Sequence, residues 1–201
     1  VVFNRVFDCP ADEQGCRTDP NQGLYLATNR SGTWRTQRLS GTRPAYQPSL
    51  RMRDGKLHIA YNDLKGIRYL TNASGVWSNH RVWSAGTRLT SSATTSIALG
   101  ASGPPSIAFM RTRCAGRADF GWCPRGDTVL RGVSLADRVG GRWSISTVSS
   151  GKDVLDRVVM SKDGWPLVGY MTGSGSKLRF RLCEVIDGDV FAYRTLPGTG
   201  K

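Results

Sequence analysis

Short apolar runs alternate with turn residues between Pro48 and Val82, and this pattern recurs along the rest of the chain. The runs lie at 49–52, 57–61, 67–70 and 77–82. Asp54-Gly55 separates the first two runs and indicates a tight hairpin, because glycine accepts a positive φ at little cost. Residues 72–75 form a second turn signal. The stretch therefore predicts an antiparallel meander of four strands.

The same reading extends to the whole chain and predicts β-structure throughout. Glycine is abundant, with 24 residues, and no stretch keeps a helical period of apolar positions. Fifteen strands are predicted, at 1–7, 23–29, 34–39, 49–52, 57–61, 67–70, 77–82, 96–99, 105–111, 129–137, 143–148, 157–161, 166–171, 177–184 and 190–196.

Two features of the meander repeat and divide the chain into four units. The second strand of each unit carries an aromatic residue: Phe3, Tyr61, Phe109 and Tyr170. A turn ending in Gly-x-Trp precedes the fourth strand at Trp34, Trp77 and Trp143, and a weaker version precedes Val190. Four strands repeated every ~40–50 residues are typical of propeller blades. We expect an all-β β-propeller of four-stranded antiparallel blades, at about 1–40, 41–84, 85–150 and 151–201. A β-sandwich is the alternative, but it does not explain the aligned aromatic residues and turns.

The first unit lacks a first, innermost strand. In many propellers a strand from the other end of the chain completes such a blade and closes the ring. The chain stops at Lys201, where the next first strand would begin. We therefore expect residues 1–201 to be one segment of a larger propeller, or to be closed by another chain.

Cysteine spacing predicts two local disulfides. Cys9–Cys16 and Cys114–Cys123 each fall in the insertion after a second strand, and each bond would stabilise the fold by about 2–3 kcal/mol. A zinc site is the rival interpretation, but the spacings are wider than usual and no histidine lies nearby, so we expect no metal. Disulfides imply a secreted or extracytoplasmic location, at the cell surface or in the periplasm. The remaining Cys183 aligns with small or apolar strand residues and is expected to be packed.

The chain is strongly basic, with 28 Lys and Arg against 15 Asp and Glu and a net charge of +13. A cation follows glycine in each loop from a fourth strand to the next first strand, and radial repetition would gather these cations at one mouth of a channel. A converging positive field attracts anions, although basic loop residues are also commonly just solvated. The expected ligand-binding residues are Arg43, Arg88, Lys152, Arg5 and Arg111, with Lys201 as a further candidate.

Two aromatic residues, Phe120 and Trp122, stand in the polar insertion that contains the second cysteine pair. Aromatic rings on a pinned loop can stack on a sugar or fill a partner's pocket, and they can equally pack beneath their own loop. No apolar run is long enough to span a membrane.

The Gly-x-Trp turns resemble the BNR-like, degenerate Asp-box-like repeats of sialidases and of secreted bacterial propellers. This resemblance implies a propeller and a secreted protein that binds or processes glycans. The chain departs from the Asp-box, because the turns at Trp34 and Trp77 have no Asp before the Gly and one residue, not two, between Gly and Trp. No sialidase site residue can therefore be transferred to this sequence.

The expected function is binding of an anionic glycan, an envelope polymer or an acidic protein surface. One alternative is a glycosidase-like enzyme, which would pair two carboxylates; whether the chain is an enzyme stays open, and its catalytic residues are unknown. Another is a structural subunit of a larger assembly. Nucleic acid fits the charge but not an oxidising compartment, and we expect no cofactor. The candidate carboxylates are Asp63, Asp119, Asp153 and Glu13.

Overall fold

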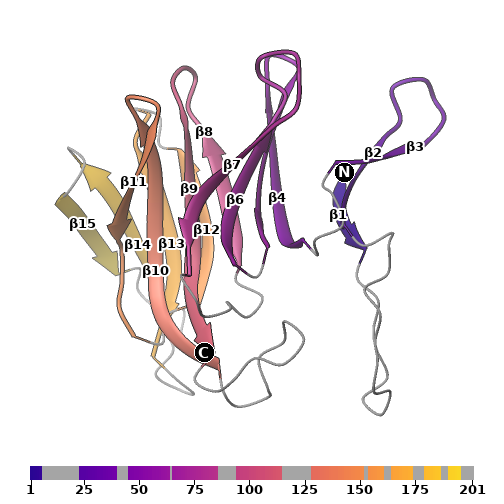
Figure 1. The fold of residues 1–201 in the computed structure, drawn as a ribbon. Helices are drawn as coiled ribbons and strands as arrows, with labels where there is room; N and C mark the ends of the chain where they lie inside the picture. Colours follow the sequence, from indigo (N-terminus) through magenta and orange to yellow (C-terminus); the bar gives the residue numbers. More distant parts are fainter. Residues whose placement is uncertain are drawn as a thin grey trace, which may run out of the picture.

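The structure, a computed structural model, consists of four antiparallel sheets that follow one another along the chain (Figure 1). It describes residues 1–5, 23–39, 45–63, 65–85, 94–114, 128–151, 154–160, 164–173, 179–186 and 190–195. Within these residues there is no helix, and so none that could cross a membrane. The all-β fold class and the grouping of strands into consecutive antiparallel sheets are confirmed.

Each sheet is a meander in which strands pair in chain order. Sheet 1 contains β1 (Val2–Arg5), β2 (Gly23–Thr28) and β3 (Arg35–Arg38). Sheet 2 contains β4 (Tyr46–Arg53), β5 (Lys56–Asn62), β6 (Gly66–Thr71) and β7 (Ser78–Ser84). Sheet 3 contains β8 (Thr95–Leu99), β9 (Pro105–Cys114), β10 (Thr128–Val139) and β11 (Arg142–Thr147). Sheet 4 contains β12 (Val154–Met160), β13 (Pro166–Thr172), β14 (Arg179–Ile186) and β15 (Val190–Thr195).

The predicted turns form where the sequence placed them. Arg53 pairs with Lys56 across the two-residue loop Asp54-Gly55, and both loop residues have positive φ, 51° and 70°. Two positive φ values define the hairpin turn whose twist matches that of the strands. The turn before β7 is closed by a hydrogen bond of 2.9 Å from the Gly75 N–H to the Asn72 carbonyl oxygen.

Sheets 2, 3 and 4 are closest to one another at their first strands, whereas sheet 1 approaches sheet 2 through β1. Figure 1 shows the sheets side by side in chain order. β8 packs against both β4 and β12, whereas no comparable contact joins the fourth strands β7, β11 and β15 within the described residues. A sheet with apolar residues on both faces is buried when it lies between two others. This arrangement gives one large core from sheets 2, 3 and 4 and a smaller core between sheets 1 and 2.

The repeated tryptophans differ in burial. Trp77 packs against the smaller core, and Trp143 packs against the larger one with its ring centroid 5.5 Å from that of Tyr69 in the preceding sheet. Trp34 occupies the corresponding turn of sheet 1 but is 62% exposed. The same turn therefore leads to different burial, and no described sheet precedes sheet 1.

Cys183 is fully buried in the large core, as expected for a packed residue. Burial raises the pKa of its thiol to about 11, so the side chain stays protonated and behaves as a small apolar group.

Candidate functional site

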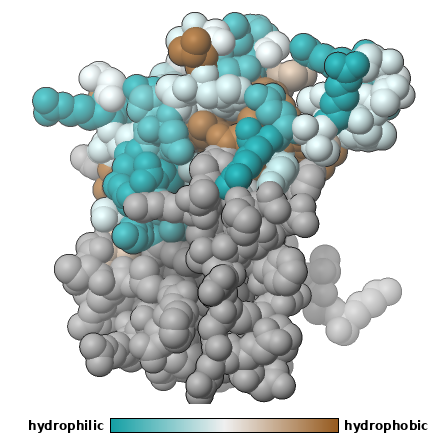
Figure 2. Space-filling view, turned by 45° about the vertical axis from the view of Figure 1, so that its right-hand side comes forward, coloured by the Kyte–Doolittle hydropathy of each residue, from teal (hydrophilic) through white to brown (hydrophobic). Residues whose placement is uncertain are grey.

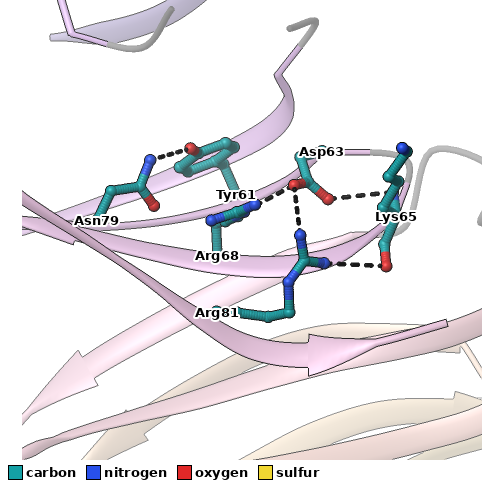
Figure 3. Close-up of polar contacts among 6 residues, drawn as sticks. All are labelled: Tyr61, Asp63, Lys65, Arg68, Asn79 and Arg81. Carbon is teal, nitrogen blue, oxygen red and sulfur yellow. Dashed lines mark hydrogen bonds and ion pairs between the residues drawn. The ribbon is translucent and has the colours of Figure 1, made fainter. Parts of the chain in front are cut away.

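A polar cluster lies where β5 ends, at the edge of sheet 2 from which β6 starts and at which β7 ends (Figure 3). Tyr61 of β5 pairs with Arg68 of β6, and Arg68 pairs with Arg81 of β7. Residues paired in this way share one face of an antiparallel sheet. Asp63 follows β5 directly, so its carboxylate reaches the two guanidinium groups from the connection between β5 and β6. We call Asp63, Lys65, Arg68 and Arg81 the arginine clamp.

The Asp63 carboxylate organises the arginine clamp. Arg68 Nε donates to Asp63 Oδ2 at 2.6 Å, and Arg81 Nη2 lies 3.6 Å from the same oxygen. The Lys65 backbone N–H donates to Asp63 Oδ1 at 3.0 Å, which closes a short turn. The Asp63 side chain is only 2% exposed. An acidic group buried and paired in this way fixes the arginines and is poorly placed to act as a catalytic acid or nucleophile.

The two arginines remain partly open to solvent. Their side chains are 22% and 35% exposed, for Arg68 and Arg81 respectively. Arg81 Nη1 also donates to the Lys65 carbonyl oxygen at 3.3 Å, whereas the structure gives the terminal amino groups of Arg68 no partner within the described part of the chain. One carboxylate faces two guanidinium groups and the nearby Lys65, so the cluster has an excess of positive charge. Guanidinium groups that are held in place in this way are suited to binding carboxylate or sulfate oxygens.

Tyr61 and Asn79 adjoin the clamp on the same face of sheet 2 (Figure 3). Asn79 Nδ2 donates to the Tyr61 hydroxyl oxygen at 2.8 Å. Burial raises the pKa of Tyr61, against a lowering by the Asn79 hydrogen bond and by Arg68, so the phenol is protonated at neutral pH. Its ring is buried in the smaller core and so supports the strand beside the arginines.

A second polar group lies on the opposite face of sheet 2, toward sheet 3. His58 Nδ1 and the Tyr69 hydroxyl are 2.6 Å apart, and the Tyr69 ring stacks between His58 and His80. Burial, and to a lesser extent the charge of Arg53, lowers the pKa of His58. His58 and Tyr69 are 4% and 2% exposed. This pair therefore contributes to packing and is not accessible to a substrate.

Strand direction places three predicted positions at the same edge as the clamp. β1, β5 and β9 are the second strands of their units, so they end at the same edge of the sheets. Arg5 is the last residue of β1, and Arg111 and Cys114 lie in the last part of β9. Arg111 is partly buried. The other predicted positions lie outside the described residues: Arg43, Arg88, Lys152, Lys201, Phe120, Trp122, Cys9, Cys16, Cys123, Asp119, Asp153 and Glu13. The two disulfides and the channel-mouth cations therefore remain predictions.

Arg68 and Arg81 are not among the site residues predicted from the sequence. Arg68 lies within the predicted strand at 67–70, where it alternates with the apolar residues Ile67 and Tyr69. Asp63, only five residues before Arg68 and across a tight turn, was the available signal. No group of three or more His, Cys, Asp or Glu side chains that could hold a metal occurs among the described residues, and the absence of a cofactor stays a prediction.

Comparison with known proteins supports the fold and does not assign a family. No family model and no curated protein matches the chain. A solved structure described as a new family of polysaccharide lyase, the PL25 ulvan lyase bound to -[GlcA(1-4)Rha3S]-, is similar with a TM-score of 0.58 and 10% sequence identity. The match covers 86% of this chain and 49% of that chain. This chain thus spans about half the length of the similar protein, and the likeness at this identity concerns the fold alone.

Proposed function

We propose that the chain binds an anionic glycan or envelope polymer through the edge of the sheets at which β5, β7 and β9 end. The arginine clamp is the observation that carries this function. Asp63 holds two partly exposed guanidinium groups in place before any ligand binds. Binding therefore loses little further side-chain entropy. A sulfate or carboxylate on a sugar would accept hydrogen bonds from Arg68 and Arg81.

The overall charge and the similar structure support an anionic ligand. A net charge of +13 gives the molecule a positive field that increases the rate of encounter with polyanions. Figure 2 shows that hydrophilic residues cover much of the described surface on the side nearest sheet 1. The similar lyase is bound to an oligosaccharide that contains glucuronic acid and a sulfated rhamnose, by its description. An acidic protein surface offers the same carboxylates and is the alternative ligand.

The wider setting belongs to the same proposal. The four sheets would be blades of a β-propeller, with divisions near residues 41, 85 and 151, and the protein would act outside the cytoplasm with its two disulfides formed. Arg5, Arg111 and the loop cations Arg43, Arg88 and Lys152 would extend the binding edge beyond sheet 2. Phe120 and Trp122 would add ring surfaces to it.

Glycan cleavage is the second candidate, and the description of the similar structure as a lyase is the observation that favours it. Within the described residues, Asp63 is committed to the arginines and His58 and Tyr69 are buried. Incubation with uronic-acid polymers and a glycoside panel separates this candidate from binding. New reducing ends or unsaturated uronic acid products would establish an enzyme.

Binding to immobilised heparin, to polygalacturonate and to neutral dextran tests the proposed function. We expect binding to both acidic polymers, none to dextran, and weakening with added salt because exposed charges are screened over about 8–10 Å near physiological ionic strength. Arg68→Gln with Arg81→Gln should weaken binding about tenfold, equivalent to about 1.4 kcal/mol.

Arg51→Gln is the control, since Arg51 is exposed on β4 and, among the described residues, donates only to its neighbour's carbonyl oxygen. Arg53 is unsuitable, because it bonds to the carbonyl oxygens of Gly100 and Gly103 and so joins sheets 2 and 3. Equal losses from the control and the clamp variant would indicate diffuse basicity and would refute a site at the clamp.

A further inference from the structure

We propose that sheet 4 carries a second anion site, formed by Arg179 and Arg181, at the same edge of the molecule as the arginine clamp. We call these two arginines the sheet 4 site. The inference rests on the proposed function and specifies its ligand, which is a polymer with several acidic groups that contacts both sites rather than a single acidic sugar. The two sites lie at equivalent positions of repeated sheets, so each can be compared with the other.

Arg181 occupies in sheet 4 the position that Arg68 occupies in sheet 2. Arg68 pairs with Tyr61 of the second strand, and Arg181 pairs in the same way with Tyr170. Tyr61 belongs to the core between sheets 1 and 2, whereas Tyr170 belongs to the large core that includes sheet 3. Residues paired across strands share a face, so both arginines lie on the face that their sheet turns toward the preceding sheet.

This face of sheet 4 is buried in its middle and ends in two cations. Val168 and Tyr170 of β13 are 0% and 1% exposed. Strand register continues the same face to Thr172, which pairs with Arg179, whereas Tyr170 pairs with Arg181. Arg181 is partly buried and Arg179 is exposed. The face therefore passes from an apolar interior, between two described sheets, to two arginines at the edge.

The sheet 4 site lacks the carboxylate that pairs with the arginines of the clamp. Asp63 stands two residues after Tyr61, whereas the residue two positions after Tyr170 is the uncharged Thr172. In the clamp, one carboxylate faces two guanidinium groups. The equivalent face of sheet 4 has two guanidinium groups and no acidic side chain among those that the structure describes. Its positive charge is therefore less compensated than that of the clamp.

Arg181 also has a buried polar atom without an acceptor. Arg68 Nε donates to Asp63 Oδ2 at 2.6 Å, whereas Arg181 Nε is buried and has no hydrogen-bond partner within the described part of the chain. A buried donor left unpaired costs free energy, and the cost is larger for a charged group. Because the side chain as a whole is only partly buried, a carboxylate or sulfate approaching from the edge would contact this guanidinium group.

Two sites on one edge favour a ligand with more than one acidic group. Packed sheets lie about 10 Å apart, so sheets 2 and 4 separate the sites by a distance on the order of 20 Å. A single acidic sugar fills one site. A longer polymer can contact both, and its second contact benefits from a high effective concentration. The expected ligand is therefore a polysaccharide with repeated carboxylate or sulfate groups.

Thermal unfolding without ligand tests whether Arg181 is unpaired in the chain. Arg68→Met should lower the melting temperature by several degrees, because the buried Asp63 carboxylate loses its closest partner. Arg181→Met should change the melting temperature by less than about 2 °C or raise it, because an unpaired buried donor is removed. The side chains of Asp153 and Asp156 are not among those described. A decrease for Arg181→Met as large as that for Arg68→Met would show that an acidic side chain of the chain itself pairs with Arg181, and would overturn the sheet 4 site.

Binding to long heparin chains and to a heparin disaccharide tests the class of ligand. Arg179→Gln with Arg181→Gln should weaken binding of the long polymer about tenfold, as the clamp variant does, because either variant keeps only one site. For the disaccharide, each variant should bind about half as much at saturation as the unchanged chain, since each loses one of two independent sites. Arg35→Gln with Arg142→Gln is the matched control, because it removes the same charge from exposed positions beside hairpin turns at the opposite edge of the sheets.

The outcomes separate this inference from the proposed function. Weaker polymer binding in the clamp variant alone would overturn the sheet 4 site and leave the proposed function intact. Weaker binding in the sheet 4 variant alone would support the sheet 4 site and overturn the role of the clamp. Equal effects of both variants and the control would indicate diffuse basicity and would overturn both sites.

Discussion

The single carboxylate of Asp63 stabilises the turn between β5 and β6 and pairs with arginines on two strands. Its oxygens accept from the Arg68 guanidinium and from the Lys65 backbone N–H, and the Arg81 guanidinium lies nearby. The side chain is buried, whereas its arginine partners are partly solvated. Each partner left without an acceptor would lose a charge-assisted or backbone hydrogen bond.

Replacement of Asp63 by Ala should lower the free energy of unfolding by about 1–3 kcal/mol, the cost of leaving hydrogen-bonding groups unpaired. Urea denaturation followed by tryptophan fluorescence measures the change. Asp54→Asn is the control, because Asn tolerates the positive φ of that turn and the effect should stay within about 0.5 kcal/mol. Equal stability of the two variants would show that the clamp is not held by Asp63.

His58 should make the protein less stable in acid. Its pKa in the folded chain lies below the ordinary value of 6.5, because burial and then the charge of Arg53 disfavour the imidazolium. The unfolded chain therefore binds the proton more readily than the folded chain. The stabilisation is present above pH 6.5 and is lost as the pH falls through the lowered pKa of the folded state.

Melting temperatures measured from about pH 8 down to about pH 5 should fall more steeply for the unchanged chain than for His58→Gln. The Gln variant loses the titrating group, so its curve should be flatter below pH 6.5. His80→Gln is a comparison at the neighbouring stacked ring. A profile for His58→Gln as steep as that of the unchanged chain would assign the acid sensitivity to other groups.

At the scale of the strand, a close approach between backbones fixes the start of β6. Gly66 has a φ of 149°, and a Cβ atom there would lie 1.9 Å from the Trp83 carbonyl oxygen. Gly132 in sheet 3 is in the same situation, with a Cβ position 2.1 Å from the Ser149 carbonyl oxygen. Gly66 is the first residue of β6, opposite the end of β7, and Gly132 lies within β10 beside the position where its pairing with β11 ends. In both sheets the glycine allows the third strand to approach the end of the fourth.

Gly66→Ala should destabilise the chain by more than about 2 kcal/mol, because both the backbone conformation and the space exclude a side chain. Gly75→Ala is the matched control: its φ of 92° is also unfavourable for alanine, but nothing lies within 4 Å of the added Cβ. The control should lose about 1 kcal/mol. Thermal unfolding of both variants measures the difference, and equal losses would mean that the contact with Trp83 is relieved easily.

At the scale of the whole molecule, the sheets form a stack with two unlike ends. The inner sheets bury both faces, whereas sheet 1 exposes Trp34 and sheet 4 exposes Met171 and Val159. The basic clamp lies at one edge of the stack, away from these outer faces.

The sequence by itself determined the strands, the turns and their grouping into sheets. These features depend on residues that are adjacent in the chain: alternating apolar positions set a strand, and Asp54-Gly55 or Asn72 to Gly75 set the turns between strands. A meander needs no long connection, so the local pattern also fixed which strands pair. The packed position of Cys183 followed from its alignment with other strand residues.

Only the tertiary structure decided which repeated residues are buried and which polar residues meet. Trp34, Trp77 and Trp143 have the same local sequence pattern, but their exposure depends on whether another sheet lies alongside. Asp63, Arg68 and Arg81 come together because a tight turn and the register of β5, β6 and β7 bring them to one face of sheet 2. Burial and long-range pairing are properties of the assembled sheets, so the pattern of a single repeat does not contain them.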